Sequence, residues 1–159
     1  MNNHDLNEQD AHFMQLALKQ AKLAAELDEV PVGAVVVLKN EVIASSHNHQ
    51  IQTNNPTAHA EVLALEQAAQ HLKNYRLPGC TLYVTLEPCL MCVGAMVHAR
   101  IDRLVYGASD PKTGMAGTVD NLIEQVYHNH QVACHGGVMA RECGQVLQDF
   151  FKAKRLAKK

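Results

Sequence analysis

The chain has 159 residues, of which 47% are hydrophobic and 19% charged, and a formal net charge of −2. This balance is typical of one globular domain, expected to span residues 1–159, and it excludes a disordered or fibrous protein. The acidic start does not resemble a signal peptide, and no apolar run approaches the roughly 18 residues of a membrane span. We therefore expect a soluble, cytoplasmic protein without membrane contact.

The first half of the chain predicts a helix, a β-hairpin and a second helix. Apolar residues recur at helical spacing in the first of these segments. Two strand-forming runs then surround a Lys39-Asn40 turn, and the first run is apolar throughout, as in a strand buried on both faces. Pro56-Thr57 can cap the second helix. The expected ranges are 7–27, 32–38, 42–47 and 58–72.

The second half alternates strands with helices around one long loop. Pro88 suits the first turn of a helix, and the Gly-containing stretch 107–117 is expected to be a surface loop of a length that is often functional. The expected strands are 81–86, 104–106 and 132–134, and the expected helices are 88–99, 121–125 and 138–155. Alternation of this kind predicts an α/β fold, a three-layer α/β/α sandwich whose mixed five-stranded sheet carries helices on both faces.

Two short motifs place metal-binding side chains at expected helix starts. His59-Ala60-Glu61 begins one helix, and Cys89 and Cys92 lie in the first turn of another. The two sulfurs share one side of their helix, whose N-terminus favours thiolates. Glu61 does not share a helix face with His59, so the two meet only near a helix end. An odd count of five cysteines argues against a disulfide scaffold.

His59, Cys89 and Cys92 would leave the fourth position of a zinc ion open, which is the pattern of a catalytic zinc site. Glu61 is then the candidate base for a water in that position. A His-x-Glu motif with Pro-Cys-x-x-Cys is the signature of zinc-dependent nucleobase deaminases, in which the glutamate carries protons. A Cys-x-x-Cys alone also fits a redox pair or half of a structural zinc site. A zinc-stabilised RNA-binding module without activity would have no use for the carboxylate.

The last eight residues, 152–159, carry five positive charges, which leaves the rest of the chain at −7 within the total of −2. Such a basic helix end can bind phosphates. It can equally be a solvated end whose cations complement the helix dipole. The tail alone does not distinguish the two.

The chain resembles the bacterial tRNA-specific adenosine deaminases over nearly its whole length. The matching stretches are EVPVGAVVV, NPTAHAEVLAL, NYRL, TLYVTLEPCLMCVGAMVHARI and GASDPKTGMAG. Asn55 stands where the family often has Asp. The zinc motif is shared with cytidine, guanine and pyrimidine-precursor deaminases, so adenine specificity rests on the longer stretches.

The resemblance implies a homodimer with the cytidine-deaminase-like fold and one Zn²⁺ per chain. It implies hydrolytic conversion of adenosine to inosine at the wobble position of a tRNA anticodon stem-loop, with Glu61 passing protons to ring N1 and to the departing ammonia. Asn48 matches the asparagine that contacts the base, Asp110 and Lys112 match the loop beside the active site, and Phe151 could stack on a nucleotide. A turn-forming Asn, a loop without contacts and a core aromatic are the alternatives for these residues.

The alternative function is a zinc-dependent deaminase of a free base, nucleoside or nucleotide, of the cytidine or guanine type. The zinc motif does not exclude it. The basic tail and the long loop favour a polymeric substrate, because a small-molecule enzyme needs no extended phosphate path.

Overall fold

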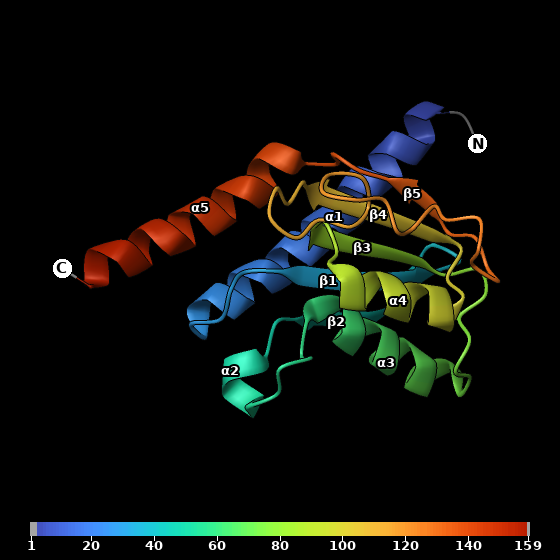
Figure 1. Cartoon of the computed structure of the whole chain (residues 1–159), viewed down its shortest axis with the longest axis horizontal. Helices are drawn as coiled ribbons and strands as arrows, with labels where there is room; N and C mark the ends of the chain where they lie inside the picture. The colour runs from blue at the N-terminus through green and yellow to red at the C-terminus, as the bar shows by residue number, and fades with distance from the viewer. Residues whose placement is uncertain (1–2, 159) are drawn as a thin grey trace.

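A mixed five-stranded sheet forms the middle layer of the protein (Figure 1). The structure is a computed structural model that describes residues 3–158, with side chains from residue 6 onward. The strands follow the order β2-β1-β3-β4-β5; β1 is antiparallel to both of its neighbours, and β3, β4 and β5 are parallel. Their bounds are β1 Gly33–Leu38, β2 Glu41–His47, β3 Thr81–Leu86, β4 Arg103–Ala108 and β5 Ala133–His135.

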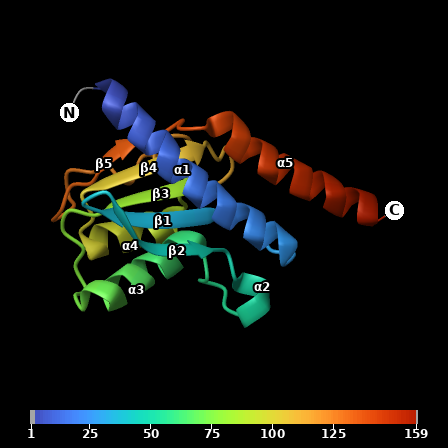
Figure 2. The same ribbon diagram turned by 180° about the vertical axis from the view of Figure 1, so that it is seen from behind.

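Helices cover both faces of this sheet, as the sequence predicted. One face carries α1 and α5, and the other carries α3 and α4, which lie side by side (Figures 1 and 2). The short α2 lies between β2 and α3 in the chain, and α5 extends beyond the sheet. The bounds are α1 Asn3–Glu26, α2 Gln50–Thr53, α3 Ala60–Leu72, α4 Leu90–Ala99 and α5 Ala140–Ala157. None of the described helices is long and apolar enough to cross a membrane.

The first strand is buried on both faces, also as predicted. Val35 and Val37 belong to the apolar cluster formed with α1, while Ala34 and Val36 belong to the larger cluster on the α3–α4 side. Successive side chains of a strand point to opposite faces, so a strand in the middle of a three-layer fold must be apolar at every position.

A buried polar contact fastens α1 to the sheet. Asp10 is 1% exposed, and its carboxylate accepts hydrogen bonds from the Tyr83 hydroxyl at 2.8 Å and from both terminal guanidinium nitrogens of Arg103 at 2.7 and 2.6 Å. Burial, followed by this carboxylate, raises the pKa of Tyr83. Because Asp10 lies on α1 and its partners lie on β3 and β4, the contact sets the position of α1 across two strands.

Two local expectations were wrong. The segment 121–125 is not a helix, because Asn121 pairs with Ala116 in an isolated β-bridge and uses its side-chain oxygen to accept the backbone N–H of Glu124. Thr57 does not cap α3, because its hydroxyl donates to the Asn55 side chain and His59 is the N-cap residue of the helix. In addition, α2 was not foreseen.

Candidate metal centre and active site

Three side chains from distant parts of the chain meet at one point with the spacing of zinc ligands. The Nδ1 atom of His59 lies 3.7 Å from the Cys89 sulfur and 3.5 Å from the Cys92 sulfur, and the two sulfurs are 3.8 Å apart. Zinc bonds of about 2.3 Å to sulfur and 2.0–2.1 Å to nitrogen, at tetrahedral angles, put two sulfurs about 3.8 Å apart and sulfur and nitrogen about 3.6 Å apart. The donor set and its edges therefore fit Zn²⁺.

The local backbone explains why these residues converge. His59 is the N-cap residue of α3 and Cys89 is the N-cap residue of α4, and both have extended backbone with φ of −77° and −82°. Each side chain thus leaves its helix at the N-terminal end, where the helix dipole favours thiolates and other anions. Cys92 follows one turn into α4, on the same side as Cys89.

The two thiols are electrostatically unequal. A hydrogen bond from Cys92, and a further one from His59, lower the pKa of the Cys89 thiol to about 3. The same contact with Cys89, together with burial, raises the pKa of Cys92, and the hydrogen bond with Cys89 raises the pKa of His59. Binding of a metal ion releases the remaining thiol proton, because only the thiolate is a ligand.

Glu61 lies beside this group, as the enzyme hypothesis requires. It is 4% exposed, occupies the first turn of α3, and lines the same cavity of about 190 Å³ as His59 and Cys89. Burial raises the pKa of its carboxyl group, which also interacts with the Cys92 thiol. His59 precedes the first helical residue of α3, whereas Glu61 lies within the helix. The two side chains therefore reach the same cavity although they are only two residues apart in the sequence.

Asn48 also lines this cavity, and its side chain forms a hydrogen bond with the first turn of α3. Its Oδ1 atom accepts the backbone N–H of Ala60 at 2.9 Å, which satisfies one of the free N–H groups at the start of the helix. This hydrogen bond fixes the orientation of the amide group at the cavity wall and leaves Nδ2 as its donor atom.

The remaining predicted residues differ in their relation to the cavity. Asp110 lines it, but its carboxylate accepts the N–H of Lys112 at 2.9 Å and the N–H and O–H groups of Thr113 at 3.1 and 2.8 Å. Burial alone would raise the pKa of Asp110, and these bonds lower it. Lys112 is exposed and does not line the cavity; Phe151, 44% exposed, lies on α5.

Several wall residues of this cavity were not among the predicted site residues. Glu87 precedes Pro88 in the matched stretch TLEPC, and Thr113 lies in the matched loop, so both motifs contained a signal. Val30, Val32 and Leu86 lie in matched stretches as well, but apolar wall residues are indistinguishable from core positions in the sequence. The missed residues are Val30, Val32, Gln50, Leu86, Glu87 and Thr113.

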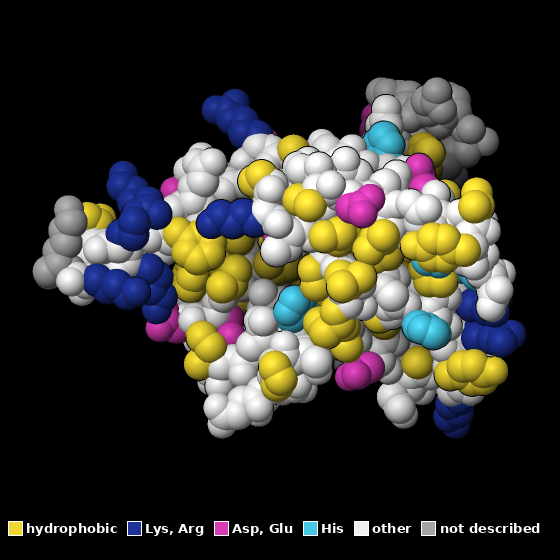
Figure 3. Space-filling view, viewed as in Figure 1, with side chains coloured by type: hydrophobic (Ala, Val, Ile, Leu, Met, Phe, Trp, Pro, Cys, Tyr) yellow, Lys and Arg dark blue, Asp and Glu magenta, His cyan; other side chains and the backbone are white. Residues whose placement is uncertain are grey.

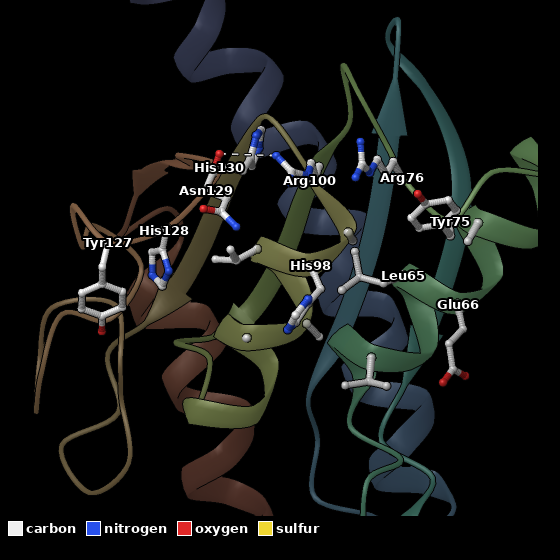
Figure 4. A pocket seen from close by; sticks show the side chains of 16 residues that line it. Leu65, Glu66, Tyr75, Arg76, His98, Arg100, Tyr127, His128, Asn129 and His130 are labelled. Carbon is white, nitrogen blue, oxygen red and sulfur yellow. Dashed lines mark hydrogen bonds between the residues drawn. The ribbon is translucent and has the colours of Figure 1, made fainter.

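A larger cavity, of about 710 Å³, contains none of the predicted site residues. It lies over α3 and α4 and is closed at one side by the segment 127–130. Figure 4 shows Tyr75 and Arg76 at one end, Tyr127 and His128 at the other, and His98 of α4 between them. Because none of the three metal-binding residues lines it, this cavity is a candidate for contact with a partner rather than for chemistry.

An α/β/α sandwich with a histidine and two cysteines at the N-termini of adjacent helices, and a glutamate beside them, defines a zinc-type deaminase. Comparison with known proteins gives the same class, since residues 7–155 match the model of the MafB19-like deaminase family. The chain belongs to the family of the bacterial tRNA-specific adenosine deaminases.

Relatives in that family match almost end to end. The chain is 47% identical to the tRNA-specific adenosine deaminase of Bacillus subtilis, over 95% of this chain and 94% of the relative. It is 47% identical to that of Haemophilus influenzae, over 96% of this chain and 89% of the relative.

Solved structures extend the comparison to the fold. A structure from a study of A-to-I editing by tRNA:A34 deaminases superposes with a TM-score of 0.83 at 46% identity, covering 86% of this chain and 99% of that one. A guanine deaminase from Nitrosomonas europaea superposes with a TM-score of 0.77 at 22% identity, over 88% of this chain and 83% of that one. The second likeness concerns the fold alone, and together they confirm the predicted cytidine-deaminase-like architecture.

Proposed function

We propose that this chain hydrolyses adenosine to inosine at the wobble position of a tRNA anticodon stem-loop. The observation that carries the proposal is the convergence of three zinc-type ligands with Glu61 in one small cavity. Relatives at 47% identity that bear the name tRNA-specific adenosine deaminase support the choice of substrate. A cytoplasmic location is part of the same proposal.

One Zn²⁺ per chain would be held by His59, Cys89 and Cys92. When bound, zinc lowers the pKa of a water molecule so that it can attack an electron-poor carbon near neutral pH. Two thiolates and a neutral imidazole give a formally neutral centre with Zn²⁺, so a carboxylate that takes up the water proton is needed.

Glu61 moves the protons of the reaction. It accepts a proton from the attacking water as the new C–O bond forms at C6 of adenine, and it delivers that proton to ring N1. It then carries the proton of the new hydroxyl group to the amino nitrogen, so that the C–N bond breaks and ammonia leaves. The net change is one water consumed, one ammonia released and inosine formed.

The cavity suits a single base that has left its stack. Its volume of about 190 Å³ offers little room beyond one nucleobase. The Nδ2 atom of Asn48 can donate to a ring nitrogen of that base, because its Oδ1 atom is already engaged. Unpaired bases in an anticodon loop are splayed out more easily than bases in a duplex.

The basic part of α5 extends the proposed contact to the RNA backbone. Figure 3 shows dark blue side chains gathered on α5, where it projects from the body. Its described cations are Lys152, Lys154, Arg155 and Lys158, while Lys159 lies outside the described residues. Exposed Phe151 on the same helix can stack on a neighbouring nucleotide.

The proposal includes a homodimer formed through the α3–α4 face. Figure 3 shows hydrophobic side chains gathered over these helices. Small residues of α4, Gly94 and Ala95, line the 710 Å³ cavity there and allow another surface to approach closely. Gly94→Arg should convert a dimer into a monomer in sedimentation, whereas Gln70→Arg, exposed on α3 outside this cavity, should not. A wild-type monomer at micromolar concentration would contradict the dimer.

The catalytic proposal is tested by competition among substrates. The protein is incubated with an anticodon stem-loop carrying adenosine at the wobble position and, separately, with free adenosine, cytidine and guanine. We expect inosine in the stem-loop and turnover of the free compounds at least about 10²-fold less efficient, because they lack the phosphate contacts. Turnover of a free compound alone would replace the tRNA substrate with the small-molecule alternative.

A further inference from the structure

Glu87 is a buried carboxylate that the proposed chemistry does not use. It follows β3, directly before Pro88 and Cys89, and is 2% exposed. Within the described part of the chain its charge is met by N–H and O–H donors, and no ion pair with a Lys or Arg is formed. A buried charge is costly unless it is fully hydrogen-bonded, so the groups that bind it are held firmly in return.

All four donors to Glu87 belong to the segment 110–118, called here the 110–118 loop. Oε1 accepts the N–H of Asp110 at 3.1 Å and the hydroxyl of Thr118. Oε2 accepts the N–H of Ala116 at 2.9 Å and that of Thr118 at 3.1 Å. The 110–118 loop has no regular hydrogen-bond ladder. The Glu87 carboxylate instead accepts the backbone N–H groups that a neighbouring strand or helical turn would otherwise bind.

Backbone hydrogen bonds around Glu87 hold the same loop. The N–H of Glu87 donates to the carbonyl oxygen of Ala108 at 2.8 Å, and the N–H of Met115 donates to the carbonyl oxygen of Pro88 at 3.0 Å. A Cβ atom at Gly114 would lie 2.4 Å from the Glu87 carboxyl carbon, so only glycine lets the loop fold this tightly around the carboxylate.

We propose that Glu87 is a positioning residue that fixes the 110–118 loop relative to Cys89, so that Asp110 and Thr113 form one wall of the base cavity. Both residues line that cavity together with Cys89 and Glu61. Cys89 is two residues from Glu87 in the chain, so the loop and the metal-binding end of α4 share a single anchor. The inference rests on the proposed function for the identity of the substrate and deepens it.

The first test is Glu87→Gln in the full-length, zinc-loaded protein. A glutamine oxygen can accept donors on one side only, and its NH₂ group must then face an N–H group of the loop. Hydrogen exchange at the amides of Asp110, Ala116 and Thr118 should accelerate about tenfold or more. With the anticodon stem-loop, KM should rise about tenfold while kcat stays within about threefold, because the loop places the base and Glu61 moves the protons.

A matched pair at Thr118 tests the same contact without changing a buried residue. Thr118 is exposed, and its hydroxyl donates to Glu87. Thr118→Val keeps the shape and removes the donor, so KM should rise about threefold. Thr118→Ser keeps the hydroxyl and should match the wild type within about twofold. This pair decides the question if Glu87→Gln does not fold.

The possible outcomes distinguish a failure of the loop-positioning proposal from a failure of the proposed RNA substrate. Unchanged exchange at the loop amides in Glu87→Gln, or faster exchange with an unchanged KM, would overturn the proposal. Loss of zinc, measured by elemental analysis, would mean that Glu87 acts through Cys89 instead, and would also overturn it. If the wild type edits no RNA, the proposed function fails, whereas faster amide exchange would still establish that Glu87 holds the loop.

Discussion

Replacing Glu61 by glutamine isolates proton transfer from metal binding. The change keeps the shape of the side chain and removes the group that accepts the water proton. Losing a general acid–base costs about 10²- to 10⁴-fold in rate. Every other carboxylate on the cavity wall is engaged, since Asp110 and Glu87 both accept several hydrogen bonds from the 110–118 loop. No neighbour can therefore substitute, and the loss should lie near the upper end, at about 10³- to 10⁴-fold, or 4 to 5.5 kcal/mol of transition-state stabilisation.

The melting temperature and zinc content of Glu61→Gln should not fall together with its reaction rate. Glu61 is 4% exposed, and burial raises the pKa of its carboxyl, which means that the ionised form is held at a cost in the folded protein. A neutral glutamine removes that cost, so the melting temperature should stay equal or rise. Zinc should remain at one per chain, because the three ligands are untouched.

The assay is single-turnover conversion of adenosine to inosine in an anticodon stem-loop, with zinc measured in the same samples. Glu41→Gln, at the exposed start of β2, is the matched control for loss of a carboxylate and should retain full activity. If Glu61→Gln keeps more than about a tenth of the wild-type rate with zinc bound, the role assigned to Glu61 is refuted.

Three further predictions concern the metal, the fold and the RNA contact. His59→Ala should reduce zinc content together with activity, and full zinc occupancy in that variant would remove His59 from the ligand set. Asp10→Ala should leave the guanidinium of Arg103 without its buried partner and lower the free energy of unfolding by about 3 kcal/mol, measured by urea titration; a loss below about 1 kcal/mol would contradict the anchoring role of this contact. Lys152→Ala combined with Arg155→Ala should raise KM for the stem-loop and reduce the dependence of log KM on log salt concentration by about 0.7 for each lost phosphate contact. An unchanged salt dependence would show that these cations face solvent.

Strands and helices with a regular apolar pattern could be predicted directly from the sequence. The strand at 81–86 has the predicted limits, and the hairpin and the long helices differ from their predicted limits by a few residues. These segments are strands with a continuous apolar run or helices whose apolar residues recur at each turn, so their burial is encoded by neighbours in sequence. The segment 121–125 failed because Asn121 pairs with Ala116, a contact that depends on how the preceding loop folds.

The sequence by itself determined the donor chemistry of the site, because His59, Glu61, Cys89 and Cys92 occur in two recognisable motifs at helix starts. Only the tertiary structure decided that these motifs lie within hydrogen-bond distance, since α3 and α4 pack side by side on one face of the sheet. It also decided the roles of Asn48 and Glu87, whose side chains each bind backbone groups more than ten residues away. Such contacts carry no local periodicity, so they follow from the folded chain and not from any segment of it.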